Sequence, residues 1–504
     1  MSDQNDRYDP EREEQEHRRV RLEKLAELER RGIDPFPMRV DRHQRAAEAL
    51  AAFRTEEGAE QPEVTVAGRI VGQIRDLGRL VFARVEDGTG GIQLMCQLKL
   101  MGDEQFDLLK RLIDPGDIVQ ACGRLVRTKS GEISIQVERL RLLAKALRPL
   151  PDKWHGLTDT EKRYRQRYLD LIANDQARQT LLTRSKIVTA TRRFLEARGF
   201  VEAETPVLHP IYGGAAARPF ETYHNALERK LYLRIALELY LKRLIVGGID
   251  KVYEIGRVFR NEGIDRQHNP EFTMLETYEA YVDYRQVMEM AEQMVASVAQ
   301  DVLGRTKIQF RGHEIELKPP WRRLPMRDAI LEFAGVDFAR HPDAASLRQA
   351  AHEAGLPVGP DWGRGKVLDE LLSTLVEPRL IEPTFLVDYS IDFPGSTLAK
   401  RQPDEPTLVE RFEGYVGGME ICNAFTELND PRDQRTRFEE QAAAAQAGDE
   451  EAHPMDEDYI VALEHGMPPT GGLGLGIDRL SMVLTDQPSI REVIFFPHLR
   501  GTGD

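Results

Sequence analysis

The chain has 504 residues, of which 41% are hydrophobic and 30% are charged, and its formal net charge is −15. A chain of this length exceeds what one hydrophobic core usually supports, so we predict two or more domains. The sequence contains no apolar run of the roughly 18 residues that a membrane span needs, and its acidic N-terminal segment lacks the apolar stretch of a secretory signal. We therefore expect a cytoplasmic protein that does not interact with membranes.

The cysteines and the charge distribution narrow the class further. Cys96, Cys122 and Cys422 lie far apart and form no C-x-x-C pair, which predicts neither a disulfide framework nor a zinc site. We interpret them as buried thiols. Residues 64–150 hold 14 Lys and Arg against 10 Asp and Glu, although the chain as a whole is acidic. One module could therefore face phosphates while the remainder repels them.

The first 63 residues are predicted to form a helical extension. Residues 9–31 are highly charged with a sparse apolar stripe, and Gly32 and Pro35 mark the end of this helix. A second short helix is expected over residues 42–53. For residues 9–31, a solvated helix that packs on its neighbour explains the pattern better than a dedicated RNA-binding arm does.

Residues 64–148 show a different period, with apolar and polar residues alternating in five segments that glycine-containing turns separate. Five such strands, with a helix near residues 103–113 between the third and the fourth, predict a five-stranded OB-fold β-barrel. Barrels of this kind bind single-stranded nucleic acid by stacking bases on aromatic side chains in a basic groove. Arg75, Phe82 and Gln93 are candidates for such contacts, although each one alone is more typical of an ordinary strand residue.

The segment 149–180 is predicted to be a linker or hinge that contains a basic, aromatic helical stretch. A second domain is expected over residues 181–504. Near its start, a helical pattern over residues 180–198 ends at Gly199 and precedes a short strand that Pro206 terminates. This arrangement is common in proteins and is a weak signal by itself.

Two features follow that could belong to a binding site. Gly214 lies in a glycine pair, which allows the backbone to approach a ligand closely. Glu238 lies in the first turn of a helix expected over residues 236–244, after a strand over residues 231–235. The helix dipole favours a carboxylate at this position whatever its function, so the position alone does not define a site.

Residues 253–281 read YEIGRVFRNEGIDRQHNPEFTMLETYEAY and predict two strands joined by a polar loop that contains His268 and Asn269. Alternate residues of a strand face the same side, so the two strands can surround one surface with charged and aromatic groups. These groups are Arg260, Glu262, Phe272, Glu276 and Tyr278. On charge content alone, a surface hairpin with scattered salt bridges is an equally good interpretation.

Two further patterns lie near the C-terminus. We interpret residues 412–431 as another strand-like run, whose notable side chains are Glu413, Glu420, Asn423, Phe425 and Glu427. Interior carboxylates are costly unless they have partners, and the partners that we infer are divalent cations and an ammonium group. Residues 468–486 then pass from a glycine-rich strand into a helix that begins near Arg479. The G-x-G within this strand lacks the third glycine of a dinucleotide fingerprint.

Taken together, these blocks resemble the class II aminoacyl-tRNA synthetases. The helix–Gly–strand–Pro arrangement resembles their motif 1, FRNEG with HNPEF resembles motif 2, and GLGLGIDR resembles motif 3. With RYRQRYLDLIAND, GGAAARPF, LYLKRL and NAFTELNDP in order behind a predicted OB-fold, residues 9–497 are similar to the bacterial type of class II lysyl-tRNA synthetase. The resemblance implies an α+β protein in which an anticodon-binding OB-fold barrel precedes a catalytic domain built on an antiparallel sheet flanked by helices.

The resemblance also implies a reaction, partners and residue roles. The reaction is the ligation of L-lysine to tRNA(Lys) through a lysyl-adenylate, with release of AMP and pyrophosphate, by a homodimer formed through motif 1. Arg260 and Arg479 would be catalytic. ATP would be bound by Arg260, Glu262, His268, Asn269, Phe272, Glu413 and Arg479. Lysine would be bound by Gly214, Glu238, Arg260, Glu276, Tyr278, Asn423, Phe425 and Glu427. Glu413 and Glu420 would hold about two or three Mg²⁺ ions together with ATP, and the anticodon would contact Arg75, Phe82 and Gln93.

Two other functions remain open at the level of sequence. An enzyme could use the same adenylate to modify a protein lysine, but relatives of that kind lack an N-terminal barrel. A binding-only paralogue could hold tRNA or a partner protein without catalysis. Such a chain would be free to lose the residues implied in catalysis, and all of them are present: Arg260, Glu413, Glu420 and Arg479.

Overall fold

The structure is a computed structural model that describes residues 10–56, 58–151, 157–446 and 454–501. The chain divides into two compact units, Met1–Thr160 and Glu161–Asp504, and the division falls within the segment that we expected to be a linker. The first nine residues of the predicted extension, the start of the aromatic stretch in the linker and residues 447–453 lie outside the described residues.

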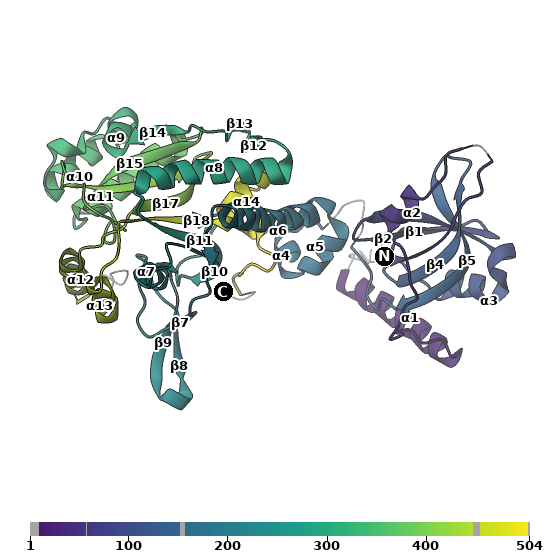
Figure 1. Ribbon diagram of the computed structural model, residues 1–504. Helices are drawn as coiled ribbons and strands as arrows, with labels where there is room; N and C mark the ends of the chain where they lie inside the picture. The colour runs from purple at the N-terminus through teal and green to yellow at the C-terminus, as the bar shows by residue number, and fades with distance from the viewer. Residues whose placement is uncertain (1–9, 57, 152–156, 447–453, 502–504) are drawn as a thin grey trace, which may run out of the picture. The chain divides into compact units, whose positions relative to one another are not determined.

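The described part of the first unit forms a closed barrel with the strand order β1–β2–β3–β5–β4 (Figure 1). Its strands are β1 (Glu63–Asp76), β2 (Leu80–Asp87), β3 (Gly90–Gln97), β4 (Ile118–Arg127) and β5 (Ile133–Ala144). Helix α3 (Leu98–Arg111) lies between β3 and β4 in the chain and begins earlier than the sequence pattern suggested, with a kink at Gly102, whose φ is 77°. The predicted five-stranded OB-fold barrel is thus confirmed over the residues described.

Helices α1 (Pro10–Arg30) and α2 (Ala46–Ala51) belong to the same unit, and α1 is tied to the barrel by buried polar contacts. The guanidinium of Arg21 donates to the carbonyl oxygens of Pro115 and Ala146, both at 2.9 Å. Lys24 of the same helix places its Nζ 2.5 Å from Oδ1 of Asp114. Helix α1 therefore packs against its neighbour, as we predicted when we preferred a packed, solvated helix over an RNA-binding arm.

In the described part of the second unit, an eight-stranded sheet has the order β14–β15–β16–β17–β18–β11–β10–β6. The strands are β6 (Val201–Glu202), β10 (Lys251–Phe259), β11 (Glu271–Ala280), β14 (Arg322–Pro325), β15 (Thr384–Ser390), β16 (Leu408–Tyr415), β17 (Glu420–Thr426) and β18 (Thr470–Gly476). The central strands pair in antiparallel fashion, as predicted, but the edge pairs β10–β6 and β14–β15 are parallel. Long crossovers connect both edge pairs, and such crossovers return the chain in the same direction. The sheet is therefore mixed.

The two faces of this sheet are covered by different helices (Figure 1). Tyr253 of β10 and Leu275 of β11 point into a core with α6 (Asp175–Glu196), α8 (Tyr284–Leu303) and α14 (Ile477–Thr485). Val252 and Tyr278 of the same two strands point into another core, with α7 (Glu238–Val246) and α13 (Glu457–Glu464). Alternation along the strands thus separates the two faces.

The remaining elements surround this framework. The other helices are α4 (Thr160–Arg165), α5 (Arg167–Ala173), α9 (Met326–Ala334), α10 (Ala344–Glu353), α11 (Arg364–Leu371), α12 (Pro431–Gln446) and α15 (Ile490–Val493). Two small sheets are formed by β7 (Leu208–His209), β8 (Glu221–His224) and β9 (Arg229–Leu233), and by β12 (Lys307–Phe310) and β13 (His313–Glu316). Among the residues described, no helix combines the length and apolar character that crossing a membrane requires. All three cysteines are buried.

The prediction of one strand-like run over residues 412–431 is wrong, because β16 and β17 form a hairpin there. The chain reverses between Val416 and Met419, whose backbone groups exchange hydrogen bonds of 3.0 and 3.3 Å. Gly417 and Gly418 have φ values of 61° and 69°, a region that favours glycine. The pairing of the two arms shifts register between Gly414 and Tyr415, so the only local signal for the turn was the Gly417–Gly418 pair.

Candidate active site

Strand register places the predicted site residues in rows across the central sheet. The first row runs across β11, β18, β17 and β16 and consists of Glu276, Gly474, Asn423 and Glu413. The next row crosses the same strands and consists of Tyr278, Gly472, Phe425 and Arg411. Because residues two apart on a strand share a face, both rows point to the same side of the sheet.

The glycines of β18 leave room above this face. A Cβ atom at Gly472 would lie 1.9 Å from Oε1 of Glu427 and 2.6 Å from Cε1 of Tyr278, so both side chains require a glycine there. At Gly474 the nearest atom to such a Cβ would be 3.7 Å away, and a side chain would enter the open space instead. The glycine-rich strand therefore forms the floor of a cavity.

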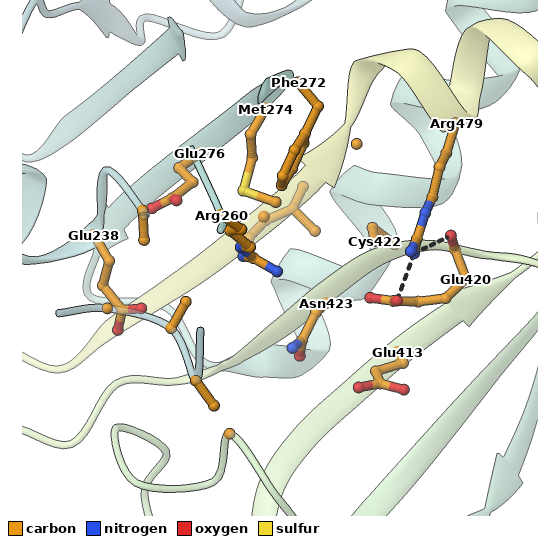
Figure 2. A pocket seen from close by; sticks show the side chains of 18 of the residues that line it. Glu238, Arg260, Phe272, Met274, Glu276, Glu413, Glu420, Cys422, Asn423 and Arg479 are labelled. Atoms are coloured by element: carbon orange, nitrogen blue, oxygen red, sulfur yellow. Dashed lines mark hydrogen bonds and ion pairs between the residues drawn. The ribbon is translucent and has the colours of Figure 1, made fainter. Parts of the chain in front are cut away.

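This cavity has a volume of about 410 Å³ and is lined by every residue that was predicted to bind ATP, lysine or metal. Figure 2 shows Glu238 and Glu276 at one end, Arg260 in the middle, and Arg479 with Glu420 at the other end. The structure thus brings together predicted residues from three strands (β11, β16 and β17), from helices α7 and α14, and from the segments that connect them.

Carboxylates dominate the first end. Glu276 accepts hydrogen bonds from the Tyr278 hydroxyl and from the Leu237 backbone N–H, each at 2.9 Å. Burial, with the nearby charge of Glu238, raises the pKa of Glu276 to about 7. Burial also raises the pKa of Glu238 and of Glu427. These buried carboxylates make this end suited to a positively charged ligand.

The sequence interpretation missed Lys242, which lies among these carboxylates. Its Nζ forms ion pairs with both Glu238 and Glu427, and its side chain is completely buried. Burial alone would lower the pKa of Lys242, but the charges of these two carboxylates raise it above its ordinary value. The spacing of four residues between Glu238 and Lys242 on one predicted helix was a signal for this pair.

Gly214 closes the same end of the cavity. Its φ is 88°, and a Cβ atom there would lie 2.9 Å from the Cβ of Ala236 and 3.1 Å from the Cβ of Glu238. A larger residue at position 214 would have a strained backbone conformation, and its side chain would be crowded by Ala236 and by Glu238 of helix α7. The glycine thus allows the loop to lie directly against Glu238.

Arg260 occupies the middle of the cavity. Its guanidinium lies 5.2 Å from the centre of the Phe272 ring, and its backbone N–H donates to the carbonyl oxygen of Pro270 at 2.8 Å. Burial lowers the pKa of Arg260, and the positive charge of Arg479 acts in the same direction. A half-buried guanidinium between two charged ends is placed to bridge two anionic groups.

The loop between β10 and β11 holds three further predicted residues in different ways. His268 Nδ1 lies 2.8 Å from Asp265, and its other ring nitrogen lies 3.4 Å from Arg479 Nη2. The buried amide of Asn269 donates to the Glu271 carbonyl at 2.6 Å, which fixes the end of the loop. Glu262 is exposed at the mouth of the cavity.

The far end combines an arginine with three acidic side chains. Arg479 Nη1 lies 2.6 Å from Glu420 Oε2 and also donates to the Glu420 carbonyl at 2.9 Å (Figure 2). Burial and the charge of Glu420 raise the pKa of Glu413. Glu377, which sequence reasoning missed because no motif contains it, accepts a hydrogen bond of 3.2 Å from Tyr415. Burial and the charges of Glu413 and Glu420 raise the pKa of Glu377 to about 8.

Glu413 and Glu420 are the carboxylates that the resemblance implies as magnesium ligands. Within the described residues, no cluster of three or more His, Cys, Asp and Glu side chains could hold a metal ion. Mg²⁺ usually takes only one or two protein carboxylates and completes its shell with phosphate oxygens and water. Oε2 of Glu413 already accepts hydrogen bonds from Tyr389 and Tyr415, whereas Oε1 accepts one from Arg411 and keeps a lone pair. The two carboxylates therefore fit Mg²⁺ that is bound jointly with a polyphosphate.

The anticodon candidates lie in the first unit. Arg75 on β1 is paired with Phe82 on β2, and Gln93 lies on β3, the next strand of the barrel. The amide of Gln93 is held by Glu132 and Ser134, each at 2.8 Å, while Arg75 is exposed. By the alternation of the strands, the three residues share one face of the barrel.

Comparisons with known proteins agree with this arrangement. The family model for class II tRNA synthetases (D, K and N) matches residues 159–500, and the model for the OB-fold nucleic acid binding domain matches residues 64–143. A lysine–tRNA ligase of Chloroflexus aurantiacus is 54% identical over 96% of this chain and 98% of its own length. One of Roseiflexus castenholzii is 56% identical over 95% and 98%, and one of Bacillus subtilis is 50% identical over 95% and 96%. The chain therefore belongs to the class II tRNA synthetase family of the D, K and N type.

Proposed function

We propose that the protein ligates L-lysine to tRNA(Lys) in an ATP-dependent reaction that proceeds through a lysyl-adenylate. The observation that carries this proposal is the charge layout of one cavity, with buried carboxylates at one end and arginines at the other. A cationic amino acid fits the first end and a triphosphate fits the second. The names of the similar proteins support the same reaction.

Lysine selection rests on the carboxylate end. The ε-ammonium would be bound by Glu238, Tyr278 and Glu427, and the α-ammonium by Gly214 and Glu276. Asn423 and Phe425 line the cavity beside them and shape the space for the aliphatic chain. An amino acid without the side-chain charge leaves buried carboxylates unpaired, which costs roughly 2 to 5 kcal/mol. Polar sites of this kind reject the wrong substrate by about 10⁴ without editing.

ATP would lie along the remaining length of the cavity. Phe272 would stack on adenine, with Glu262, His268 and Asn269 on the loop beside it. Arg260 would hold the α-phosphate and the lysine carboxylate together, because a guanidinium can bridge two oxyanions. Arg479 would bind the γ-phosphate. Glu413 and Glu420 would hold Mg²⁺, about two or three ions with ATP, which supplies neutralisation of the phosphate charge when bound.

The first step needs positioning and charge neutralisation more than proton transfer. The lysine carboxylate is ionised at neutral pH and attacks the α-phosphorus, which forms the lysyl-adenylate and releases pyrophosphate. No protein base is required because the nucleophile carries no proton. Holding both reactants in line and stabilising the developing phosphate charge can supply the rate.

The second step of the proposed reaction transfers the lysyl group from the adenylate to tRNA. A terminal ribose hydroxyl of tRNA attacks the lysyl carbonyl, and AMP leaves. The anticodon would be bound by Arg75, Phe82 and Gln93 of the barrel. We propose the domains 1–63, 64–148, 149–180 and 181–504, and a cytoplasmic homodimer formed through motif 1.

Charging of tRNA separates this proposal from the alternatives. The purified protein, with ATP, Mg²⁺ and radiolabelled lysine, should acylate a tRNA that carries a lysine anticodon. An enzyme that modifies protein lysines would form the adenylate but leave this tRNA uncharged. A binding-only paralogue would do neither. Absence of acylation by a folded, ATP-binding preparation would contradict the proposal.

A further inference from the structure

Lys242 lies inside the group of side chains that we assign to the substrate ammonium. Its Nζ forms ion pairs with Oε1 of Glu238, one helical turn earlier on α7, and with Oε2 of Glu427. Its ammonium lies 5.4 Å from the centre of the Phe425 ring and 5.8 Å from that of Tyr278. The cavity therefore already contains one cation of its own where it would recognise another.

This lysine is a fixed part of the structure. Its side chain has no exposed surface, and it extends from the buried side of α7 into the core shared with α13. The pair with Glu238 joins residues four apart on one helix, a spacing at which the two side chains meet. Aromatic rings that face a cation stabilise it further where water is excluded. Lys242 is thus held on several sides.

The ion pairs leave one oxygen of each carboxylate for a ligand. Lys242 uses Oε1 of Glu238 and Oε2 of Glu427, and within the described chain no hydrogen bond reaches Glu238 Oε2 or Glu427 Oε1. Each of these two oxygens lies against a glycine that lines the cavity. Glu238 Oε2 would lie 3.7 Å from a Cβ atom at Gly214, and Glu427 Oε1 would lie 1.9 Å from one at Gly472. A ligand ammonium in the cavity would find these two oxygens.

The charges then match a single incoming ammonium. Glu238 and Glu427 carry two negative charges and Lys242 one positive charge, so this group has a net charge of −1. Glu276 lies outside these ion pairs and remains for a second ammonium of the same ligand. Without Lys242, two buried carboxylates would face each other with no resident partner, a costly arrangement in a site without ligand.

We propose that Lys242 is a specificity-determining positioning residue, a resident counter-cation that holds both carboxylates and sets the charge of the side-chain pocket to match one ammonium. This inference rests on the proposed function and deepens it. Its consequence is that the effect of removing a carboxylate depends on whether Lys242 is present. When Lys242 is present, Glu427→Gln leaves Glu238 and Lys242 as the charged groups, so the pocket has no net charge and Lys242 repels the substrate ammonium. Without Lys242, the same substitution leaves one free carboxylate for the substrate.

The test is a double-mutant cycle on the Michaelis constant for lysine, measured by lysine-dependent ATP–pyrophosphate exchange. Glu427→Gln alone should raise the KM for lysine by about 100-fold. The double variant Lys242→Met/Glu427→Gln should have a lower KM than Glu427→Gln alone, by about tenfold. Such a reversal of sign would not arise if Lys242 only filled space, because two packing defects would make binding worse together.

Controls separate this effect from misfolding and from failure of the proposed function. Lys145→Met removes another completely buried lysine with two carboxylate partners, in the barrel, and should leave the KM for lysine unchanged. If Lys242→Met alone unfolds, the inference is still tested by comparing the KM for lysine of the double variant with that of Glu427→Gln. The double variant removes one positive and one negative charge, so the net charge of the pocket stays the same, whereas Lys242→Met alone leaves two buried carboxylates that face each other. A KM in the double variant equal to or above that of Glu427→Gln, or an unfolded double variant, would overturn the inference. A wild-type protein without lysine-dependent exchange would instead overturn the proposed function.

Discussion

The hydroxyl of Tyr278 donates a hydrogen bond of 2.9 Å to Oε2 of Glu276, two residues earlier on the same face of β11. The other oxygen of Glu276 accepts a backbone N–H at the start of helix α7. The carboxyl is therefore oriented by two donors but has no cationic partner in an ion pair within the residues described. Burial and the charge of Glu238 then raise its pKa to about 7.

This pKa predicts how lysine activation depends on pH. Below pH 7 Glu276 is mostly protonated in the free protein and attracts the α-ammonium weakly, and above pH 7 it is ionised. The value of kcat/KM for lysine in ATP–pyrophosphate exchange should therefore rise between about pH 6 and pH 8 and then level off. Glu276→Gln should lower kcat/KM and abolish this rise. Glu279→Gln, on the opposite face of the same strand, should keep it. A rise that survives in Glu276→Gln would assign the titration to another group.

Loss of a single carboxylate at the ammonium end should affect one substrate selectively. Glu238→Gln and Glu427→Gln each remove a charge that we assign to lysine recognition, so each should raise the KM for lysine by about 100-fold. The KM for ATP should change by less than about threefold, since neither residue is assigned to the nucleotide. Equal changes in both constants would show that the ammonium site lies elsewhere. Thermal unfolding of each variant serves as the check on folding.

Substitutions on the barrel should affect tRNA and not lysine activation. Phe82→Leu removes the aromatic face that we assign to a stacked base, and a stacked base contributes roughly 1 to 3 kcal/mol. The KM for tRNA in aminoacylation should therefore rise by about 5-fold to 150-fold, whereas exchange in the absence of tRNA should match the wild type. Arg75→Ala should show the same selectivity. If exchange falls as much as aminoacylation, the anticodon assignment is wrong.

Residues 201–208, which follow helix α6 and belong to the predicted motif 1, should form an interface between two copies of the chain. Val201 is 54% exposed and Leu208 is 45% exposed, although both are apolar, and β6 lies at the edge of the large sheet. Light scattering after size exclusion should give twice the 57.4 kDa mass of the chain. Leu208→Glu should shift the protein toward the mass of a single chain. A wild-type protein that is monomeric at micromolar concentration would contradict the assignment of motif 1 to dimerisation.

Much of the fold could be predicted from the sequence because period and turn residues carry that information locally. The alternation in residues 64–148 predicted the OB-fold barrel, and the run from Phe272 to Tyr278 placed Glu276 and Tyr278 on one face of a strand. The turn at Gly417 was missed because residues 412–431 were interpreted as one run on the strength of their polar and acidic side chains, although a Gly-Gly pair favours a hairpin turn. The parallel edges of the sheet were missed because pairing between distant segments leaves no local pattern.

The sequence predicted which motif residues line the cavity, but it did not predict the buried charged residues Lys242 and Glu377 that accompany them. Motif residues such as Arg260 and Arg479 line the cavity as expected, since collinear motifs identify them without any contact information. Lys242 was read only as part of a helix, because a lysine in a helical pattern is usually solvated. Its ion-pair partner Glu427 lies far away in the sequence and reaches it only through the folded sheet. Glu377 is likewise placed by tertiary packing near Glu413.

The most direct test of the central claim compares lysine with norleucine, which has the same carbon chain but no side-chain amine. We predict that the wild-type protein supports ATP–pyrophosphate exchange with lysine in the absence of tRNA, with a kcat/KM about 10⁴-fold higher than with norleucine. Comparable values for the two amino acids, or no exchange with lysine, would contradict the claim that this cavity recognises an ammonium group and activates the amino acid that carries it.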